Sequence, residues 1–274
     1  MKFLALLTVA LILLFTPWRR GYPRDVLEKL IRFALAREKQ WTLLWVILLV
    51  LAPVGLLLWW LQGWAYGLFT LLVHVALLLL CVGRHDPLGR VSHEFTQLWE
   101  RGEARAAAEL ARRHMDLQVK EPALLAVAVK KRMVATSLTD YFVPVFWYLL
   151  LGPLGALAYR LLYLSREHSS VTASQPAHLL AHAFEWIPAR LLALSFALVG
   201  HFDSTLRALR DMAADWELSG GELVTRCAEE ALQGAPAQAA TELGAGNVLA
   251  STHQLLIRAL MVWAVIIAFF AMMG

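Results

Sequence analysis

Long apolar runs alternate with short charged segments along this chain. Two of the runs, Trp41 to Leu61 and Trp64 to Val82, are each close to the roughly 20 residues that a transmembrane helix needs. Only Gln62-Gly63 separates them. The pattern therefore predicts a transmembrane hairpin whose turn faces the periplasm, with its tryptophans at the level of the lipid headgroups.

Two further apolar runs lie near the ends of the sequence. Phe3 to Phe15 has the length of a signal-peptide core or an interfacial helix, and because no small-residue cleavage site follows it, we expect it to be retained. Leu255 to Met273 is long enough for a last span, and Arg258 near its start can extend its charged group to the interface. The pattern thus predicts an all-α, polytopic membrane protein.

The stretch from Asp140 to Phe202 is the centre of this organisation. Its first apolar run, Val143 to Tyr163, is interrupted by Gly152-Pro153-Leu154-Gly155, where proline removes a backbone donor and glycine frees the backbone. At membrane depth, such a break requires surrounding protein or a watery cavity. We therefore expect two half-helices in a re-entrant hairpin that returns Asp140 and Arg166 to the same face.

The charged segments define the rest of the chain. Residues 17–40 hold seven Lys or Arg against three acids, and residues 83–139 hold ten against seven, which is typical of cytoplasmic loops. Within 83–139, a helix start at Asp86-Pro87, a stop at Gly102 and a new start at Glu121-Pro122 predict a small cytoplasmic helical layer. Residues 203–254 hold eight acids against three Arg, and their side of the membrane stays open because acids contribute little to orientation.

These patterns divide the chain into six regions. They are an N-terminal apolar helix with a basic segment (1–40), the transmembrane hairpin (41–82), the cytoplasmic helical region (83–139), the broken membrane-embedded motif (140–203), an acidic helical region (204–254) and the C-terminal span (255–274).

Composition agrees with this interpretation. Apolar residues make up 59% of the 274 residues, charged residues make up 17% against about 25% in soluble domains, and the mean hydropathy is +0.57. The formal charge of +4 is concentrated beside apolar runs, so topology explains it and no nucleic-acid partner is predicted. The two cysteines, Cys81 and Cys227, provide neither a disulfide framework nor metal-ligand spacing. We predict no metal site and no cofactor.

Several polar residues lie directly beside the apolar runs, and a re-entrant hairpin could bring them to one polar cavity at the cytoplasmic face. In one interpretation, Asp140 or Glu185 pairs with Arg190 or Arg84 as a structural salt bridge, because unpaired charge at this depth is costly. In the other, the arginines form a pocket for an anion or an amide. The candidate ligand-binding residues are Arg84, His85, Asp86, Asp140, Glu185, Arg190, His201 and Asp203.

Histidines give weaker signals. His74 is the ionisable residue inside the predicted hairpin, and we expect it to be neutral and hydrogen-bonded to a neighbouring helix, although such residues are also functional candidates. His178 and His182 have the spacing that puts two ligands on one helix face, but the His-Glu-x-x-His pattern of zinc hydrolases is absent. We expect a polar helix at the membrane surface there.

Four segments carry a resemblance to a known family: YFVPVFW (141–147), GPLGALAYR (152–160), WIPARL (186–191) and ALVGHFD (197–203). They are similar to the AmpE family of bacterial inner-membrane proteins. The resemblance implies a multi-pass protein of the inner membrane that acts as a non-catalytic sensor or modulator of β-lactamase induction and peptidoglycan recycling. It implies as partners the N-acetylmuramyl-alanine amidase encoded beside it or a muropeptide-type ligand.

The AmpE family resembles in turn the cobinamide-phosphate synthases (CobD and CbiB). Where those enzymes carry acidic and asparagine residues, this chain has Thr136-Ser137 before the broken run, Tyr163 to Arg166 at its end, and Ala181-His182 before the Pro-Ala-Arg step. Most carboxylates that could hold magnesium and a nucleotide are therefore missing, and no phosphate-binding loop is present. We do not expect ligase activity.

Two alternatives stay open. One is a residual nucleotide-dependent, amide-forming enzyme of the synthase type. The other is a small transporter or flippase of cell-wall fragments, because broken helices at membrane depth are typical of transporters.

Overall fold

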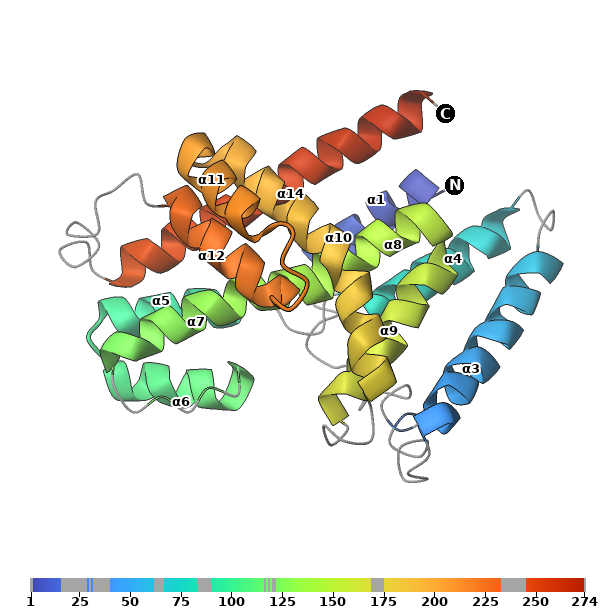
Figure 1. Cartoon of the computed structure of the whole chain (residues 1–274), viewed down its shortest axis with the longest axis horizontal. Coiled ribbons are helices and arrows are strands. Elements are labelled where there is room, and N and C mark those ends of the chain that lie inside the picture. Colours follow the sequence, from blue (N-terminus) through green and yellow to red (C-terminus); the bar gives the residue numbers. More distant parts are fainter. Residues whose placement is uncertain are drawn as a thin grey trace. The chain divides into compact units, whose positions relative to one another are not determined.

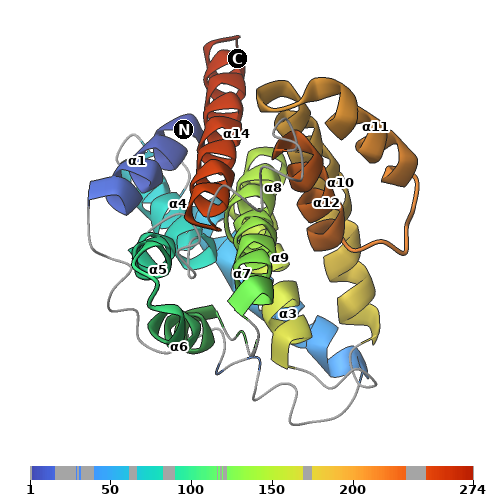
Figure 2. The ribbon, with the colours of Figure 1, turned by 90° about the vertical axis from the view of Figure 1, so that its left-hand side faces the viewer.

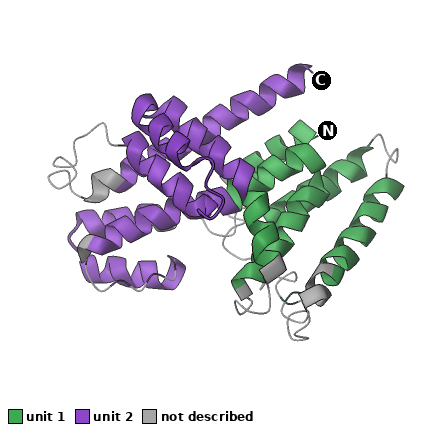
Figure 3. Cartoon of the chain, in the orientation of Figure 1, with its two compact units in different colours: residues 1–84, 140–185 green, residues 85–139, 186–274 purple. Residues whose placement is uncertain are grey.

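The computed structural model describes residues 2–15, 29, 31, 40–61, 67–82, 90–115, 117, 119, 122–168, 175–232 and 245–273. Every element in these ranges is a helix, which confirms the predicted all-α class (Figure 1). The chain forms two compact units: residues 1–84 with 140–185, and residues 85–139 with 186–274 (Figure 3). Most of the predicted basic segment, 17–40, lies outside the described residues.

Unit 1 is built around two short helices that follow each other in the chain. They are α8 (Val143–Leu151) and α9 (Pro153–His168). The N-terminal helix α1 (Lys2–Phe15) packs against α4 (Leu68–Cys81) and α8. Helices α3 (Gln40–Trp60) and α4 both pack against α9, so the predicted hairpin covers the second half of the broken run.

Helix α3 has the length that its apolar run predicts, whereas α4 is shorter than the predicted run Trp64 to Val82. Helix α4 begins after Gly67, whose positive φ of 83° marks the turn, and Thr70 Oγ1 donates to the Leu61 carbonyl 3.1 Å away across it. The fourteen residues of α4 rise about 21 Å, which is less than the roughly 30 Å of a bilayer core.

Three helices among the described residues are long and apolar enough to cross a membrane: Leu124–Leu151, Ala177–Val199 and Leu249–Met273. The first of them extends beyond the third helix of the predicted helical layer. Helix α7 (Pro122–Ser137) continues through a π-helical turn, η3 (Leu138–Phe142), directly into α8. The hydroxyls of Ser137 and Thr139 donate to backbone carbonyls of the preceding turn, so these polar residues stay within the helix.

The predicted break lies at Gly152. This residue has a φ of 73° and caps α8, and Pro153 begins α9, so both predicted half-helices are confirmed. At Gly155 a Cβ atom would lie 2.7 Å from the Trp147 carbonyl oxygen, which explains why only glycine allows α9 to approach α8 this closely.

Unit 2 contains the predicted helical layer. Helices α5 (Arg90–Glu100) and α6 (Ala104–Met115) are joined at Gly102, which has a φ of 75°, and they lie side by side (Figure 2). They pack with α7 and the C-terminal helix α14 (Ala245–Met273). The apolar core of this layer consists of Phe95, Ala107, Ala111, Met115, Leu125, Val129, Met133 and Leu249.

The remaining helices of unit 2 follow α10 (Gln175–Val199), whose residues from 186 onward belong to this unit. Helices α11 (Phe202–Met212) and α12 (Gly220–Leu232) pack against each other, and α12 also contacts α7 and α14. The acidic region therefore contains the helices that its sequence predicts, and its residues 233–244 lie outside the described residues.

Candidate functional site

Asp140 and Arg160 form a buried ion pair in unit 1. The guanidinium Nη1 of Arg160 lies 3.4 Å from Asp140 Oδ1, and the two side chains are 1% and 0% exposed, respectively. Twenty residues of continuous helix would separate these positions by about 30 Å. The pair therefore shows that the chain reverses direction at Gly152, as the re-entrant interpretation predicts.

A second buried carboxylate, Glu185, is held by α9. Arg166 donates from Nη1 to Glu185 Oε2 at 3.1 Å and lies 3.0 Å from Oε1 through Nη2, so the contact is bidentate. The hydroxyl of Tyr159 donates to Glu185 Oε1 at 3.0 Å. Glu185 is buried, and three hydrogen bonds satisfy its charge.

Tyr163 connects the two pairs. The Cζ atoms of Arg160 and Arg166 lie 5.3 Å and 5.2 Å from the centre of its ring, within the range of cation–π attraction. Asp140 and Arg166 thus belong to one continuous group, as expected from the hairpin. We call this group the ionic cluster; its members are Asp140, Tyr159, Arg160, Tyr163, Arg166 and Glu185.

Four members of the cluster are not among the predicted ligand-binding residues: Tyr159, Arg160, Tyr163 and Arg166. Of these, Arg160 carries the buried charge that faces Asp140. It lies at the end of the GPLGALAYR segment, seven residues after the proline that starts α9. Tyr159, Tyr163 and Arg166 follow helical spacing on α9. A charge deep within an apolar run is the signal that could have identified Arg160, since such a charge requires a partner.

Arg190 has a different role from the predicted one. Its Nε donates to the Ala213 carbonyl at 2.8 Å, its Nη2 to Asp215 O and its Nη1 to Trp186 O, both at 3.0 Å. The guanidinium also lies 3.8 Å from the centre of the Trp186 ring. Arg190 therefore closes the C-terminal end of α11, where carbonyls have no partners within the helix.

The predicted pairing of Asp140 or Glu185 with Arg190 is accordingly wrong, because Arg160 and Arg166 hold these carboxylates. Glu185 and Arg190 are five residues apart on α10, which places them about 140° apart around the helix axis. The other predicted partner, Arg84, and its neighbours His85 and Asp86 lie outside the described residues.

The last two candidates, His201 and Asp203, are exposed at the turn between α10 and α11. The backbone N–H of His201 donates to the Ala231 carbonyl at 3.1 Å. Asp203 lies in the first turn of α11, where a negative charge suits the helix dipole. Neither residue belongs to the ionic cluster, and His201 lines a separate pocket of unit 2.

His74 is hydrogen-bonded to a neighbouring helix, as predicted. Its Nδ1 lies 2.9 Å from the Tyr148 hydroxyl of α8, and the two rings meet edge to face. His178 and His182 both lie on α10. Within the described ranges, no three His, Cys, Asp or Glu side chains lie close enough together to hold a metal ion.

Comparisons with known proteins assign the chain to a family. The family model of the regulatory signalling modulator protein AmpE matches residues 3–274. The protein AmpE of Shigella flexneri is 25% identical over 254 residues, which cover 85% of this chain and 87% of that protein.

A second relative comes from cobalamin synthesis. The cobalamin biosynthesis protein CobD of Chromobacterium violaceum is 28% identical over 182 residues, which cover 62% of this chain and 56% of that protein. This match therefore extends over only about half of that relative. No solved structure matches the chain. Since the AmpE model matches almost from end to end, the chain belongs to the AmpE family of regulatory signalling modulators.

Proposed function

We propose that this protein is a non-catalytic modulator in the bacterial inner membrane, linked to the regulation of β-lactamase induction and to peptidoglycan recycling. The match of the AmpE model to residues 3–274 carries this proposal. The helices that are long and apolar enough to span a bilayer support a multi-pass arrangement. A muropeptide-type ligand and the amidase encoded beside the gene are the proposed partners.

The ionic cluster supports a role without catalysis. Its two carboxylates are buried, and each already faces an arginine, Asp140 facing Arg160 and Glu185 facing Arg166. A magnesium ion would have to displace these guanidinium groups before either carboxylate could become its ligand. The cluster is thus suited to hold the broken helices together, since a buried charge is stable only when it is paired.

The experiment is a deletion of the gene in the source bacterium, followed by complementation with the wild-type gene. β-Lactamase expression is measured together with the cytoplasmic and periplasmic muropeptide pools. We expect deletion to change expression while the pools stay constant, and complementation to restore it. A shift of muropeptides between compartments would instead support a transporter, and unchanged expression would contradict the proposal.

A second candidate function is a residual enzyme of the cobinamide-phosphate synthase type. The 28% identity to CobD favours it. Binding of magnesium–nucleotide to the purified protein, lost in Asp140→Asn and Glu185→Gln, would establish this candidate. We expect no binding, because both carboxylates face arginines.

A further inference from the structure

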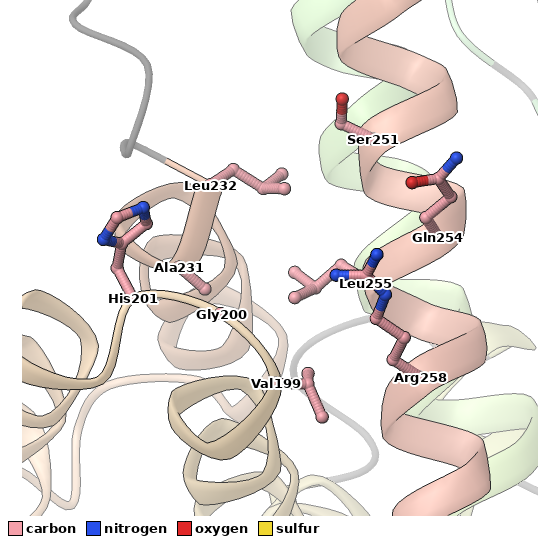
Figure 4. A pocket seen from close by; sticks show the side chains of 9 residues that line it. All are labelled: Val199, Gly200, His201, Ala231, Leu232, Ser251, Gln254, Leu255 and Arg258. Carbon is pink, nitrogen blue, oxygen red and sulfur yellow. The ribbon is translucent and has the colours of Figure 1, made fainter.

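Unit 2 contains a pocket that neither the family nor the proposed regulatory role explains. It has a volume of about 400 Å³ and lies between α14 on one side and the α10–α11 turn with the end of α12 on the other (Figure 4). Val199, Leu232 and Leu255 give it apolar walls, and His201, Gln254 and Arg258 give it polar groups. It therefore suits a ligand that has both an apolar and a polar part.

The walls of the pocket are fixed by specific contacts. A Cβ atom on Gly200 would lie 2.7 Å from the Ala231 carbonyl oxygen, so only glycine allows the turn to approach α12 this closely. On the other side, Trp263 Nε1 of α14 donates to Ser195 Oγ of α10 at 3.0 Å. These contacts hold α12 and α14 in place on the two sides of the pocket.

The polar groups of α14 are available to a ligand. Gln254 and Arg258 are four residues apart and share one face of the helix. The guanidinium of Arg258 points from α14 into the space that separates it from the α10–α11 turn (Figure 4). Within the described part of the chain, neither side chain has a hydrogen bond or an ion pair. A guanidinium in this position is a donor for an anion.

Arg258 also marks a boundary along α14. The helix before it contains Asn247, Ser251, Thr252, His253 and Gln254, whereas residues 259–273 contain no charged side chain. Within this apolar part Met261, Val265, Ile266, Phe269 and Phe270 are exposed, as expected for a surface that faces lipid. Since charge within a span is costly, Arg258 is stable at headgroup depth, where phosphates lie.

We propose that this pocket binds the phosphate of an anionic phospholipid from the surrounding bilayer. Arg258 forms a bidentate, charge-assisted contact with the phosphate, and the Gln254 amide donates a further hydrogen bond. Val199 and Leu255 contact the apolar part next to the headgroup. The site does not depend on the proposed regulatory role, because it requires only that α14 lies in a membrane.

The test uses the full-length protein in detergent and measures the binding of short-chain phosphatidylglycerol, short-chain phosphatidylcholine and inorganic phosphate. We expect phosphatidylglycerol to bind most tightly. Arg258→Gln should weaken its binding about tenfold, the effect of losing one charge-assisted contact. Arg258→Lys should fall between the two, because it keeps the charge and loses the planar fork.

Arg210→Gln is the matched control, since Arg210 is an exposed arginine of the same unit that does not line the pocket. It should bind phosphatidylglycerol as the wild type does, and thermal unfolding should show that all variants are folded. Equal binding of both lipids, or unchanged binding by Arg258→Gln, would overturn the proposal. Inorganic phosphate that binds as tightly as phosphatidylglycerol would overturn the lipid assignment and indicate a soluble anion.

Discussion

Asp140 and Arg160 illustrate what a charge requires inside this protein, because both are buried and each compensates the other. Asp140→Asn and Arg160→Met should each lower the free energy of unfolding by about 3–5 kcal/mol, since each leaves a buried charge without its partner. The double variant should lose less than the sum of the two. Denaturant unfolding in detergent measures all three, and additive losses would show that the pair is not coupled.

Glu109 on α6 provides the control for this comparison, because its ion pairs with Arg112 and Arg113 are exposed. These arginines lower the pKa of Glu109 from 4.5 to about 2. A lowered pKa in the folded state means that the contribution is present above about pH 4.5 and is lost as the pH falls through about 2. Water screens this site, so Glu109→Gln should leave the unfolding midpoint nearly unchanged at neutral pH.

Cys227 of α12 should resist thiol reagents. Burial raises its pKa from 9.0 to about 11, so the folded protein contains almost no thiolate at pH 8. Maleimide labelling at pH 8 should modify it only after unfolding. Because the pKa of Cys227 is higher in the folded state, the contribution of this thiol to stability is complete below about pH 9. It is lost as the pH rises through about 11. Rapid labelling of the native protein would contradict this burial.

For single residues, the sequence predicts which buried polar side chains need a partner, but not which residue that partner is. Asp140 and Glu185 stand out because they flank apolar runs, and His74 because it lies within one. Their partners depend on how far each helix is rotated, and spacing along the chain does not contain that information. The prediction for Arg190 was wrong for this reason. Its side chain lies on a different face of α10 from Glu185, and it bonds to the backbone carbonyls that follow α11.

The turn between α8 and α9 separates two roles of glycine that a substitution can distinguish. Gly152→Ala strains a backbone with a φ of 73° but meets no neighbouring atom, and should cost about 1–2 kcal/mol. Gly155→Ala places its Cβ 2.6 Å from Leu151 Cβ and 2.7 Å from Trp147 O, so the helices must separate. We expect the larger loss of stability for Gly155→Ala, measured by thermal unfolding.

Gly102→Ala on the α5–α6 turn is the matched variant for this pair. Its φ of 75° is nearly that of Gly152, and a Cβ atom would again meet nothing within 4 Å. It should therefore cost about as much as Gly152→Ala. A loss at Gly155 no larger than the other two would indicate that α8 and α9 separate without cost.

The elements themselves were largely predictable where glycine and proline mark their ends. Gly152-Pro153 gives the break, and Gly102 gives the α5–α6 turn. The continuation of α7 through η3 into α8 was not predicted, because the predicted regions 83–139 and 140–203 divide the chain there, next to the polar residues Ser137 and Thr139. Their hydroxyls donate to backbone carbonyls of the same helix, so the helix continues past them. The sequence alone does not show these hydrogen bonds.

For the molecule as a whole, the excess of basic residues in 83–139 predicts that α5 and α6 lie in the cytoplasm. Ala106→Cys puts a thiol on the exposed side of α6, while both natural cysteines are buried. An impermeant maleimide should label it in inverted membrane vesicles and not in spheroplasts. The reverse labelling would invert the topology, and the natural cysteines provide the unlabelled background.

Arg190 has a consequence for genetics. Two of its donor nitrogens bond to backbone carbonyls just after α11 and the third bonds to the Trp186 carbonyl of α10, so the side chain serves the fold of unit 2. A missense allele at this codon should act through the amount of protein in the cell, because a frayed unit is a target for quality-control proteases. Such an allele would resemble a null mutation, and an immunoblot would distinguish lost protein from lost signalling.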